Sequence, residues 1–342
     1  MNLPIQPPYL PMEASTADVI PEGPNWQYEP KWDGFRCLAF RDGDEVDLQS
    51  KSAQGLARYF PELLEALRRI PAKRFVLDGE IVIPDGGNLS FDELLQRIHP
   101  AESRIRKLSK EHPAVLIVFD ILVDGHGTLL ADRPLAERRR RLQEFAAESF
   151  EGNHSVALSP ATCHLAEAKH WFKTMAGGLD GIIAKRLDAA YEAGERGAMQ
   201  KIKNLRAADC VIGGFRYATK GKLVGSLLLG LYDDAGLLQH VGFCSSIHSG
   251  DKEAVTAKLE ALRGGSGFTG RAPGGPSRWS GKRSTEWEPL DPTLVVEVQY
   301  DHFTGGRFRH GTKLLRWRPD KAPKQCKMAQ VERETKSPLG LI

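Results

Sequence analysis

The stretch EPKWDGFR, residues 29–36, places a lysine and an aspartate two positions apart, with a glycine directly after the acid. Such a stretch is compatible with an ordinary strand edge followed by a turn. It is also compatible with a lysine that does chemistry, because burial or neighbouring positive charge lowers the pKa of a lysine from about 10.4 toward neutrality. Gly34 would let a phosphate approach the backbone closely. Taken alone, the stretch leaves both interpretations open.

The sequence around this stretch predicts a mixture of strands and helices. Apolar residues alternate or run continuously in the predicted strands, and they recur at helical spacing in the predicted helices. Strands are predicted at 35–40, 45–51, 74–84, 114–123, 179–186 and 198–205, and helices at 59–70, 91–98 and 134–148. The last of these helices contains four consecutive arginines, which we interpret as a solvated face.

The predicted secondary structure changes after about residue 204, from a mixture of strands and helices to mostly short strands. Short strands separated by Gly/Asp turns are predicted at 210–218, 225–234, 237–246 and 293–303, with one helix at 252–263 and a Gly/Pro/Ser-rich loop at 264–283. Several short strands with a single helix suit a small barrel of the oligonucleotide-binding (OB) type. We therefore predict an α+β domain of antiparallel sheets with helices at residues 1–205, followed by an all-β OB-fold domain at residues 206–342.

Composition indicates an ordinary globular protein, with 41% hydrophobic and 27% charged residues. No stretch reaches the roughly 20 apolar residues that a membrane helix needs. The amino-terminal residues 1–15 are proline-rich and lack the pattern of a signal peptide, so we expect an extended arm on a cytoplasmic protein. Separately, we expect the protein to be a monomer. The five cysteines are far apart without a C-x-x-C pair, which favours reduced thiols over a zinc site or a disulfide framework.

Positive charge is concentrated toward the carboxyl terminus. Residues 205–342 contain 21 Lys and Arg against 14 Asp and Glu, whereas the whole chain has a net charge of only +3. Between His302 and Lys327 there are eight basic residues and one acid, Asp320. This distribution suits a polyanionic partner, although charge alone is equally compatible with a solvated basic tail.

Six short motifs give the opening stretch its context. In chain order they are KWDGFR at 31–36, LDGEIVI at 77–83, LIVFDIL at 116–122, DGIIAKR at 180–186, QKIKN at 200–204 and RWRPDK at 316–321. Together they resemble motifs I, III, IIIa, IV, V and VI of the covalent nucleotidyltransferases, which comprise DNA ligases, RNA ligases and mRNA capping enzymes. The resemblance spans almost the whole chain and implies an adenylation (nucleotidyltransferase) domain followed by an OB-fold domain.

The resemblance assigns the attacking nitrogen to Lys31, which would displace pyrophosphate from ATP and become a lysyl-adenylate. Lys201 and Lys203 alternate along a predicted strand, so both side chains project to one face. The resemblance places that face against the α-phosphate, where two cations would offset charge in the transition state and disfavour protonation of Lys31. For the pair considered alone, a solvated strand face is an equally good interpretation.

Further residues of the first domain are implied to hold the nucleotide. Glu80 would accept hydrogen bonds from a ribose hydroxyl and Phe119 would stack on adenine, whereas Glu29 would read the adenine edge. Arg36 would support the nucleotide and the phosphate at a nick. Lys51 stands where relatives usually carry a ribose-contacting arginine, and this departure matters because lysine lacks the bidentate fork.

The remaining motif positions are implied to contact metal and phosphate. Asp180 replaces the usual glutamate of motif IV, and together with Glu80 it would hold Mg²⁺ or Mn²⁺. Asp33 would either contact the water shell of the metal or only pin the strand. Lys185 would face phosphate. The clamp on the β- and γ-phosphates would consist of Arg316, Arg318, Asp320 and Lys321, which requires the two domains to close for the first step.

Within the superfamily, the chain is most similar to the small bacterial ATP-dependent DNA ligases called ligase C. This similarity implies nicked duplex DNA as the substrate, association with the nucleoid during work on DNA, and repair proteins as possible partners. The alternatives are an RNA ligase, a capping-type enzyme that uses GTP, and a non-catalytic nucleic-acid-binding repair scaffold. The presence of Lys31, Lys201, Lys203 and Glu80 argues against the scaffold.

Overall fold

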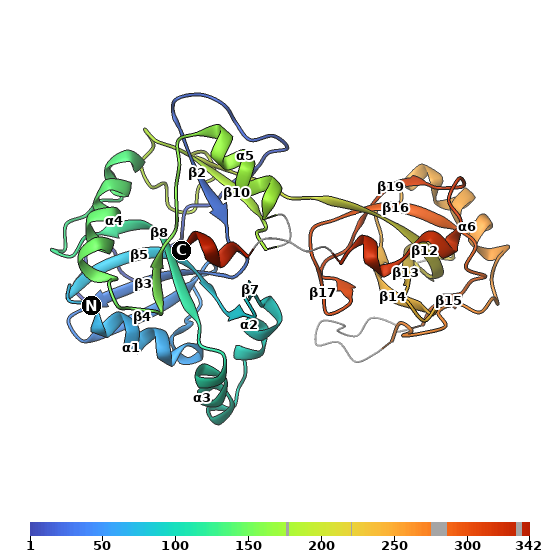
Figure 1. The fold of residues 1–342 in the computed structure, drawn as a ribbon, viewed down its shortest axis with the longest axis horizontal. Coiled ribbons are helices and arrows are strands. Elements are labelled where there is room, and N and C mark those ends of the chain that lie inside the picture. The colour runs from blue at the N-terminus through green and yellow to red at the C-terminus, as the bar shows by residue number, and fades with distance from the viewer. Residues whose placement is uncertain (176–177, 220, 275–285, 333–336) are drawn as a thin grey trace. The chain divides into compact units, whose positions relative to one another are not determined.

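The computed structural model describes residues 1–175, 178–219, 221–274, 286–332 and 337–342. These residues form two compact units, one of residues 1–204 together with 335–342 and the other of residues 205–334. Each unit has its own core and is described by itself (Figure 1). Among the described residues, no helix combines the length and the apolar character that crossing a membrane requires.

The first unit contains two principal sheets. The larger has the order β4-β3-β5-β8-β9 and is antiparallel except for the β8–β9 pair, and the smaller has the order β1-β11-β10-β2 and is antiparallel except for the β1–β11 pair. A two-stranded pair, β6–β7, accompanies them. The strands are β1 (Ser15–Thr16), β2 (Trp26–Lys31), β3 (Phe35–Asp42), β4 (Glu45–Ser50), β5 (Arg74–Val82), β6 (Pro84–Asp85), β7 (Asn88–Leu89), β8 (Val115–Val123), β9 (Val156–Leu158), β10 (Gly181–Arg186) and β11 (Met199–Lys203).

Helices pack against these sheets through their apolar stripes. The α-helices are α1 (Pro61–Arg69), α2 (Phe91–Arg97), α3 (Glu102–Glu111), α4 (Leu135–Ser149) and α5 (Leu165–Thr174), and η1 (Ala57–Tyr59) is a 3₁₀ turn. Helix α1 buries Leu63, Ala66 and Leu67, which recur at the three- and four-residue spacing of one helix face. The first core is thus formed between the larger sheet and its helices.

The arginine run of α4 is only partly solvated, contrary to our expectation, because Arg140 is exposed whereas Arg138 and Arg139 are buried. Arg138 is fully buried, and its guanidinium donates to both carboxylate oxygens of Asp120 on β8, at 2.9 and 3.0 Å. Arg139 is also buried and donates to the carbonyl of Ser159. A buried charge is tolerated when it is paired and hydrogen-bonded, and a charge pattern in the sequence does not reveal a partner 18 residues away.

Two glycines are required by close approach of the backbone. A Cβ at Gly34 would overlap the carbonyl of Ile81 and lie 2.9 Å from Cγ of Glu80, so this glycine lets β3 begin directly beside β5. Gly181 has a φ of +144°, and a Cβ there would overlap the carbonyl of Ile202 on β11. The glycine of the opening stretch therefore has a reason in strand packing.

The second unit is mostly β-structure. Its main sheet has the order β14-β13-β12-β16-β19, with β15 also pairing with β12, and all these pairs are antiparallel. One α-helix, α6, accompanies the sheet among the described residues. The elements are β12 (Arg206–Tyr217), β13 (Val224–Tyr232), β14 (Leu238–Cys244), α6 (Lys252–Glu260), β15 (Glu288–Pro289), β16 (Val295–Tyr300), β17 (Phe303–Thr304), β18 (Arg307–Phe308) and β19 (Lys313–Trp317), with 3₁₀ turns η2 (Ser249–Asp251), η3 (Pro323–Gln325) and η4 (Met328–Gln330).

The last residues of the chain pack on the first unit. They form the 3₁₀ turn η5 (Pro338–Leu341), in which Pro338 is buried and Leu341 packs against an apolar cluster that includes Trp32. The hydroxyl of Ser337 donates to the carbonyl of Gly87 beside β7. The tail therefore differs from the predicted division, which placed all of residues 206–342 in the second domain.

Candidate nucleotide-binding and catalytic site

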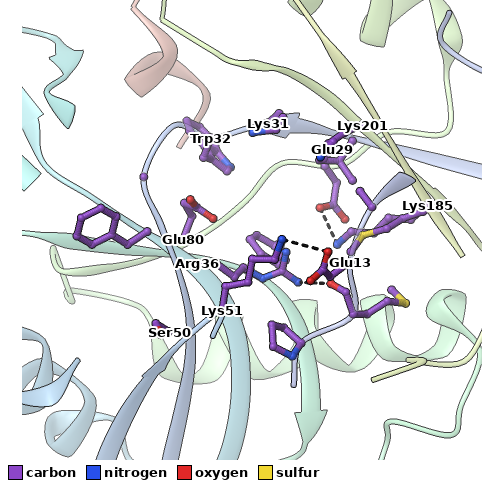
Figure 2. A pocket seen from close by; sticks show the side chains of 18 of the residues that line it. Glu13, Glu29, Lys31, Trp32, Arg36, Ser50, Lys51, Glu80, Lys185 and Lys201 are labelled. Carbon is purple, nitrogen blue, oxygen red and sulfur yellow. Dashed lines mark hydrogen bonds and ion pairs between the residues drawn. The ribbon is translucent and has the colours of Figure 1, made fainter. Parts of the chain in front are cut away.

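The first unit contains a cavity of about 810 Å³ whose walls come from both of its principal sheets (Figure 2). One wall comes from β2, β10 and β11, and the other from β3, β5 and β8. Residues 10–14 of the amino-terminal arm and residues 50–52 after β4 complete the lining. Eight predicted site residues line this cavity: Glu29, Lys31, Arg36, Lys51, Glu80, Phe119, Lys185 and Lys201.

Lys31 is the last residue of β2, paired in register with Gly181 of β10. Its Nζ forms an ion pair with Oδ2 of Asp180, and the amide of Asp180 donates to the carbonyl of Lys31 at 3.0 Å. The Lys31 side chain is about a quarter exposed, whereas that of Asp180 is almost buried. Asp180 thus holds Lys31 at the cavity wall, and Lys31 would have to leave this carboxylate before it could attack as a nucleophile.

Lys201 and Lys203 lie on β11, beside β10, opposite Ile183 and Gly181 respectively. Lys201 lines the cavity, whereas Lys203 is not among the lining residues. Desolvation lowers the pKa of Lys201, and the charges of Lys31 and Lys51 lower it further. Positive charge is therefore concentrated on the wall that also carries Lys31, and an anion between these side chains would be stabilised.

Glu29 and Lys185 form a buried ion pair across β2 and β10, with Oε2 and Nζ 2.8 Å apart. The amide of Gln27 donates to the other carboxylate oxygen of Glu29, also at 2.8 Å. The same Lys185 Nζ lies 4.5 Å from the ring centroid of Phe119 on β8. Lys185, predicted to face phosphate, is consequently in contact with both Glu29 and Phe119, which were predicted to face adenine.

Arg36 on β3 is committed to a carboxylate. Its guanidinium donates to both oxygens of Asp78, at 2.6 and 2.5 Å, and the hydroxyl of Tyr191 donates to the same carboxylate at 2.6 Å. Although burial opposes the charge, Asp78 raises the pKa of Arg36, and the guanidinium lies 4.6 Å from the ring centroid of Phe119. Asp78 and Tyr191 therefore fix Arg36 beside the ring of Phe119 in the cavity.

Glu80 lies on β5, paired with Arg36 of β3. Burial disfavours its charged form and raises the pKa of the carboxyl to about 7, against the opposing attraction of Lys31 and Arg36. A carboxyl that titrates near neutrality inside a cleft marks a candidate functional group. At pH 7 this group can both accept and donate hydrogen bonds.

The amino-terminal arm contributes an acid that the sequence did not single out. Oε2 of Glu13 lies 3.1 Å from Nζ of Lys51 and 2.7 Å from the guanidinium of Arg196 (Figure 2 shows the Glu13–Lys51 contact). The arm is anchored to the first unit by the buried side chains of Leu3, Ile5 and Met12. Glu13, Asp78 and Tyr191 are the residues around this site that motif comparison missed.

The predicted metal-binding acids do not form a ready-made cage. Within the described part of the chain, no three His, Cys, Asp or Glu side chains are grouped in a way that could hold a metal ion. Asp180 pairs with Lys31, and Asp33 is not among the residues that line the cavity. Mg²⁺ normally binds through one or two carboxylates and substrate phosphates, so these acids fit a metal that arrives with a polyphosphate.

The three basic residues of the predicted clamp lie on and after β19 in the second unit, and each has an acidic partner. Arg316 pairs with Glu297, and Arg318 donates to Asp209 and Asp320, both at 2.8 Å. Nζ of Lys321 lies 2.7 Å from the second oxygen of Asp209. The hydrogen bond from Arg318 lowers the pKa of Asp320 to about 2. Asp209, on β12, was also missed by motif comparison.

Comparison with known families identifies both units. A family model described as "ATP dependent DNA ligase domain" matches residues 11–203, and one described as "ATP dependent DNA ligase C terminal region" matches residues 220–321. Together the two matches cover most of the chain, and they agree with the architecture of an α+β unit followed by a mostly β unit. The predicted fold class is confirmed.

Individual proteins lead to the same family. The chain is 45% identical to DNA ligase C1 of Mycolicibacterium smegmatis, over 97% of this chain and 96% of the relative, and 42% identical to DNA ligase C of Mycobacterium tuberculosis over the same shares. A solved structure from a study of Lig E DNA ligases matches with a TM-score of 0.54 at 16% identity, over 90% of this chain and 99% of that one, which shows a shared fold. The chain belongs to the ATP-dependent DNA ligase family.

Proposed function

We propose that this chain seals nicks in duplex DNA with ATP, through an adenylate carried on Lys31. The observation that carries the proposal is the position of Lys31 in the wall of a large cavity, next to Lys201 and in contact with Asp180. Its family membership and its similarity to mycobacterial DNA ligase C over nearly the whole chain support the same activity.

In the first step, Nζ of Lys31 loses a proton and attacks the α-phosphorus of ATP. The new P–N bond forms as the bond from that phosphorus to the bridging oxygen breaks, and pyrophosphate leaves. Asp180 contacts the nitrogen and is placed to take the proton, while Lys201 offsets the charge that develops on the phosphate.

In the second step, an oxygen of the 5′-phosphate at the nick attacks the phosphorus of the lysyl-adenylate. The P–N bond breaks and Lys31 regains its proton, leaving AMP on the DNA end. In the third step, the 3′-hydroxyl attacks the 5′-phosphorus and loses its proton, AMP departs, and the phosphodiester is complete.

The cavity residues divide the recognition of ATP among them in this proposal. Phe119 would stack on adenine, and Glu29 would read its edge after exchanging part of its contact with Lys185. Glu80 would accept a hydrogen bond from ribose. Arg36, held by Asp78, would support the stack from behind and contact phosphate only if it left that carboxylate.

Lys51 and Lys203 have supporting roles in the same proposal. Lys51 would contact the ribose from the rim of the cavity, where Glu13 orients it. Lys203 would add positive charge behind Lys201 rather than touch the nucleotide, because it does not line the cavity. Lys51 would act from the rim of the cavity and Lys203 from a distance, so the stabilisation that each gives the nucleotide would be weaker than that from Lys201.

Mg²⁺ or Mn²⁺ would be held by Asp180 and Glu80 together with the phosphates, and Asp33 would contribute through water or only support the strand. The ion would offset negative charge on the polyphosphate. Arg316, Arg318 and Lys321 would clamp the β- and γ-phosphates after exchanging their carboxylate partners for phosphate oxygens.

The setting proposed for this activity is a monomer in the bacterial cytoplasm, associated with the nucleoid and with repair proteins. All five cysteines are free thiols and four are buried, which supports a reducing compartment. Sedimentation at working concentration tests the monomer, and a second copy bound under those conditions would contradict it.

The decisive experiment compares Lys31→Ala with the wild-type protein after incubation with ATP. Wild type should gain one adenylate, about 329 Da by intact mass, and Lys31→Ala should gain none. Lys169→Ala is a matched control, because Lys169 is exposed on α5 and pairs with Glu22 away from the cavity. Adenylate mass on Lys31→Ala would refute the assignment.

A second arm of the experiment addresses the rival activities. Labelled ATP and GTP are offered in parallel, followed by nicked DNA and nicked RNA duplexes. The proposal expects label from ATP and sealing of DNA. Label from GTP alone would indicate a capping-type enzyme, and sealing of RNA alone would indicate an RNA ligase.

A further inference from the structure

Strand β2 places three polar side chains on the same face, and the proposed function uses only two of them. Gln27, Glu29 and Lys31 alternate along the strand, so all three project to one side of the sheet. Glu29 and Lys31 line the cavity, whereas Gln27 is buried and is not among the lining residues. Gln27 therefore lies on the cavity side of the sheet without reaching the cavity itself, which makes it a candidate for holding a neighbour in place.

Gln27 and Lys185 hold the carboxylate of Glu29 through separate oxygens. Nε2 of Gln27 donates to Oε1 of Glu29 at 2.8 Å, and Nζ of Lys185 lies 2.8 Å from Oε2 (Figure 2 shows the Glu29–Lys185 contact). The two partners come from neighbouring strands, because Gln27 of β2 is paired in register with Lys185 of β10. Each carboxylate oxygen thus has a partner of its own, and all three side chains belong to residues that are at most 3% exposed.

The two contacts constrain Glu29 differently. A hydrogen bond is directional and weakens steeply when its angle departs far from linearity. Nζ of Lys185 has no hydrogen-bond partner within the described part of the chain, although it lies 2.8 Å from Oε2, so its contact with Glu29 is an ion pair without a well-aligned hydrogen bond. The ammonium acts as a point charge that fixes distance rather than orientation. The orientation of the carboxylate is therefore set by the amide of Gln27.

An oriented carboxylate selects its ligand by hydrogen-bonding character. An ionised carboxylate only accepts hydrogen bonds, and each of its oxygens can accept more than one. At ring position 6, adenine carries an amino group, which donates, whereas guanine carries a carbonyl oxygen, which accepts. A buried group built to pair with one of these rejects a ligand that lacks the matching partner, because its polar atoms are then left unpaired. Base selection by Glu29 consequently depends on where its oxygens are held.

We propose that Gln27 is a positioning residue for the recognition of adenine, because it fixes the carboxylate of Glu29 so that one oxygen faces the 6-amino group of the base. The inference rests on the proposed function, in which Glu29 reads the adenine edge. When Glu29 exchanges part of its contact with Lys185 for the base, the hydrogen bond from Gln27 keeps the carboxylate in place. Gln27 acts through Glu29 and touches neither the nucleotide nor the reacting atoms.

The test compares ATP with purine riboside 5′-triphosphate, which differs from ATP only in lacking the 6-amino group. The second-order rate constant for formation of the protein–nucleotide adduct is measured with each triphosphate in wild type and in Gln27→Met, which keeps the length of the side chain but removes the amide. Wild type should prefer ATP about 10- to 100-fold, the loss expected for one hydrogen bond to a charged group. Gln27→Met should lose most of this preference, because its rate with ATP falls about tenfold while its rate with the analogue changes less than about twofold.

A double-mutant cycle measures whether Gln27 acts through Glu29. Glu29→Ala should abolish the preference for ATP by itself, and adding Gln27→Met should not change the ratio of the two rates further. Gln27→Asn, whose amide is one methylene shorter, should lose less of the preference than Gln27→Met and replaces it if that variant does not fold.

The matched control is Gln49→Met, because Gln49 is also a buried glutamine of the first unit but hydrogen-bonds the backbone of Tyr9 instead of Glu29. It should lower the melting temperature, as the loss of a buried hydrogen bond does, without changing the ratio of the two rates. A purely structural role of Gln27 would give the same result as this control.

A loss of equal size with both triphosphates in Gln27→Met would overturn the proposal, as would an unchanged preference for ATP. These outcomes are separate from failure of the proposed function, in which wild type would form no adduct with either triphosphate. In that case the Kd values of the two triphosphates are compared by equilibrium dialysis in the same variants, so that the role of Gln27 is judged by binding alone. A preference for ATP in binding that survives Gln27→Met would again contradict the proposal.

Discussion

Lys201 in the cavity of the first unit and the cations after β19 of the second unit lie in opposite electrostatic environments. In the cavity, desolvation and the neighbouring charges of Lys31 and Lys51 lower the pKa of Lys201. After β19, hydrogen bonding to Asp320 and the charge of Asp209 raise the pKa of Arg318. Positive charge is thus disfavoured at Lys201, whereas carboxylates neutralise it after β19, as they also do at the other cavity lysines, Lys31, Lys51 and Lys185.

The difference suggests an order of events. A polyphosphate that enters the cavity relieves unfavourable charge there and is stabilised at once. The clamp residues have carboxylate partners to lose, so their contribution to phosphate binding is the difference between two ion pairs. We therefore expect substitution of Lys201 to have a larger effect on adenylation than substitutions after β19.

The largest effect should come from Lys201→Ala, which removes a cation from the wall that carries Lys31. Loss of one preorganised group that stabilises transition-state charge typically lowers the rate about 100- to 1000-fold. Single-turnover adenylation with labelled ATP measures this rate. Lys203→Ala should have a smaller effect, since Lys203 does not line the cavity. If Lys201→Ala and Lys203→Ala lowered the adenylation rate equally, the expected difference between the two lysines would be contradicted.

A smaller effect, about tenfold, is expected for Arg318→Ala on the rate of self-adenylation. The reason is that Arg318 must first leave Asp209 and Asp320 before it can stabilise the departing pyrophosphate. Sealing of a pre-adenylated nick should be less affected, because no pyrophosphate leaves in that step. Rates of the two reactions measured side by side test the clamp, and equal losses would argue against it.

The sequence predicted many of the strands and helices because the apolar periodicity that buries a strand or helix is local, but it did not predict α3, α5 or β19. For the same reason it predicted that Lys201 lies on a strand, whereas the pairing of this strand with the motif IV strand came only from the structure. It did not distinguish Lys201 from Lys203, since alternation gives both the same face but not the same distance along the cavity. How deep a side chain lies within the cavity depends also on the residues that form its other walls, which come from other parts of the chain.

Contacts between distant segments were the main features that the sequence did not reveal. Asp78 holds Arg36 from 42 residues away, and Glu13 holds Arg196 from 183 residues away. A lone acid in an extended arm carries no periodic or motif signal that would reveal its partner. The packing of the tail residues 337–342 on the first unit is of the same kind, because it depends on an apolar cluster formed elsewhere in the chain.

The contrast between the two regions also predicts opposite effects of pH on stability. The pKa of Glu80 is raised to about 7, above its ordinary value of 4.5, so ionised Glu80 destabilises the folded protein fully above pH 7. Glu80→Gln should therefore stabilise the protein at pH 8, by about 1–2 kcal/mol after allowance for solvent in the cavity. This gain should shrink as the pH falls from 7 toward 4.5, as measured by calorimetry.

Asp320→Asn should have the opposite sign. The pKa of Asp320 is lowered to about 2 from 3.8, so its stabilising contribution is present above pH 3.8 and is lost as the pH falls through 2. Asp320→Asn should consequently destabilise the second unit slightly at pH 7. If Glu80→Gln and Asp320→Asn changed the free energy of unfolding in the same direction at pH 7–8, the two regions would not differ as described.

The smallest effect is expected for Glu13→Gln at the rim of the cavity. The substitution removes a negative charge that faces the incoming polyphosphate, and the amide oxygen still accepts a hydrogen bond from Lys51. The KM for ATP should fall about twofold with an unchanged kcat, and the difference should vanish at high salt because the interaction is exposed and screened. Glu22→Gln is the control, since Glu22 pairs with Lys169 outside the cavity. A raised KM in Glu13→Gln would show instead that the charge of Glu13 positions Lys51 for the nucleotide. The rim of the cavity would then resemble the clamp after β19, where each cation is held by a carboxylate partner.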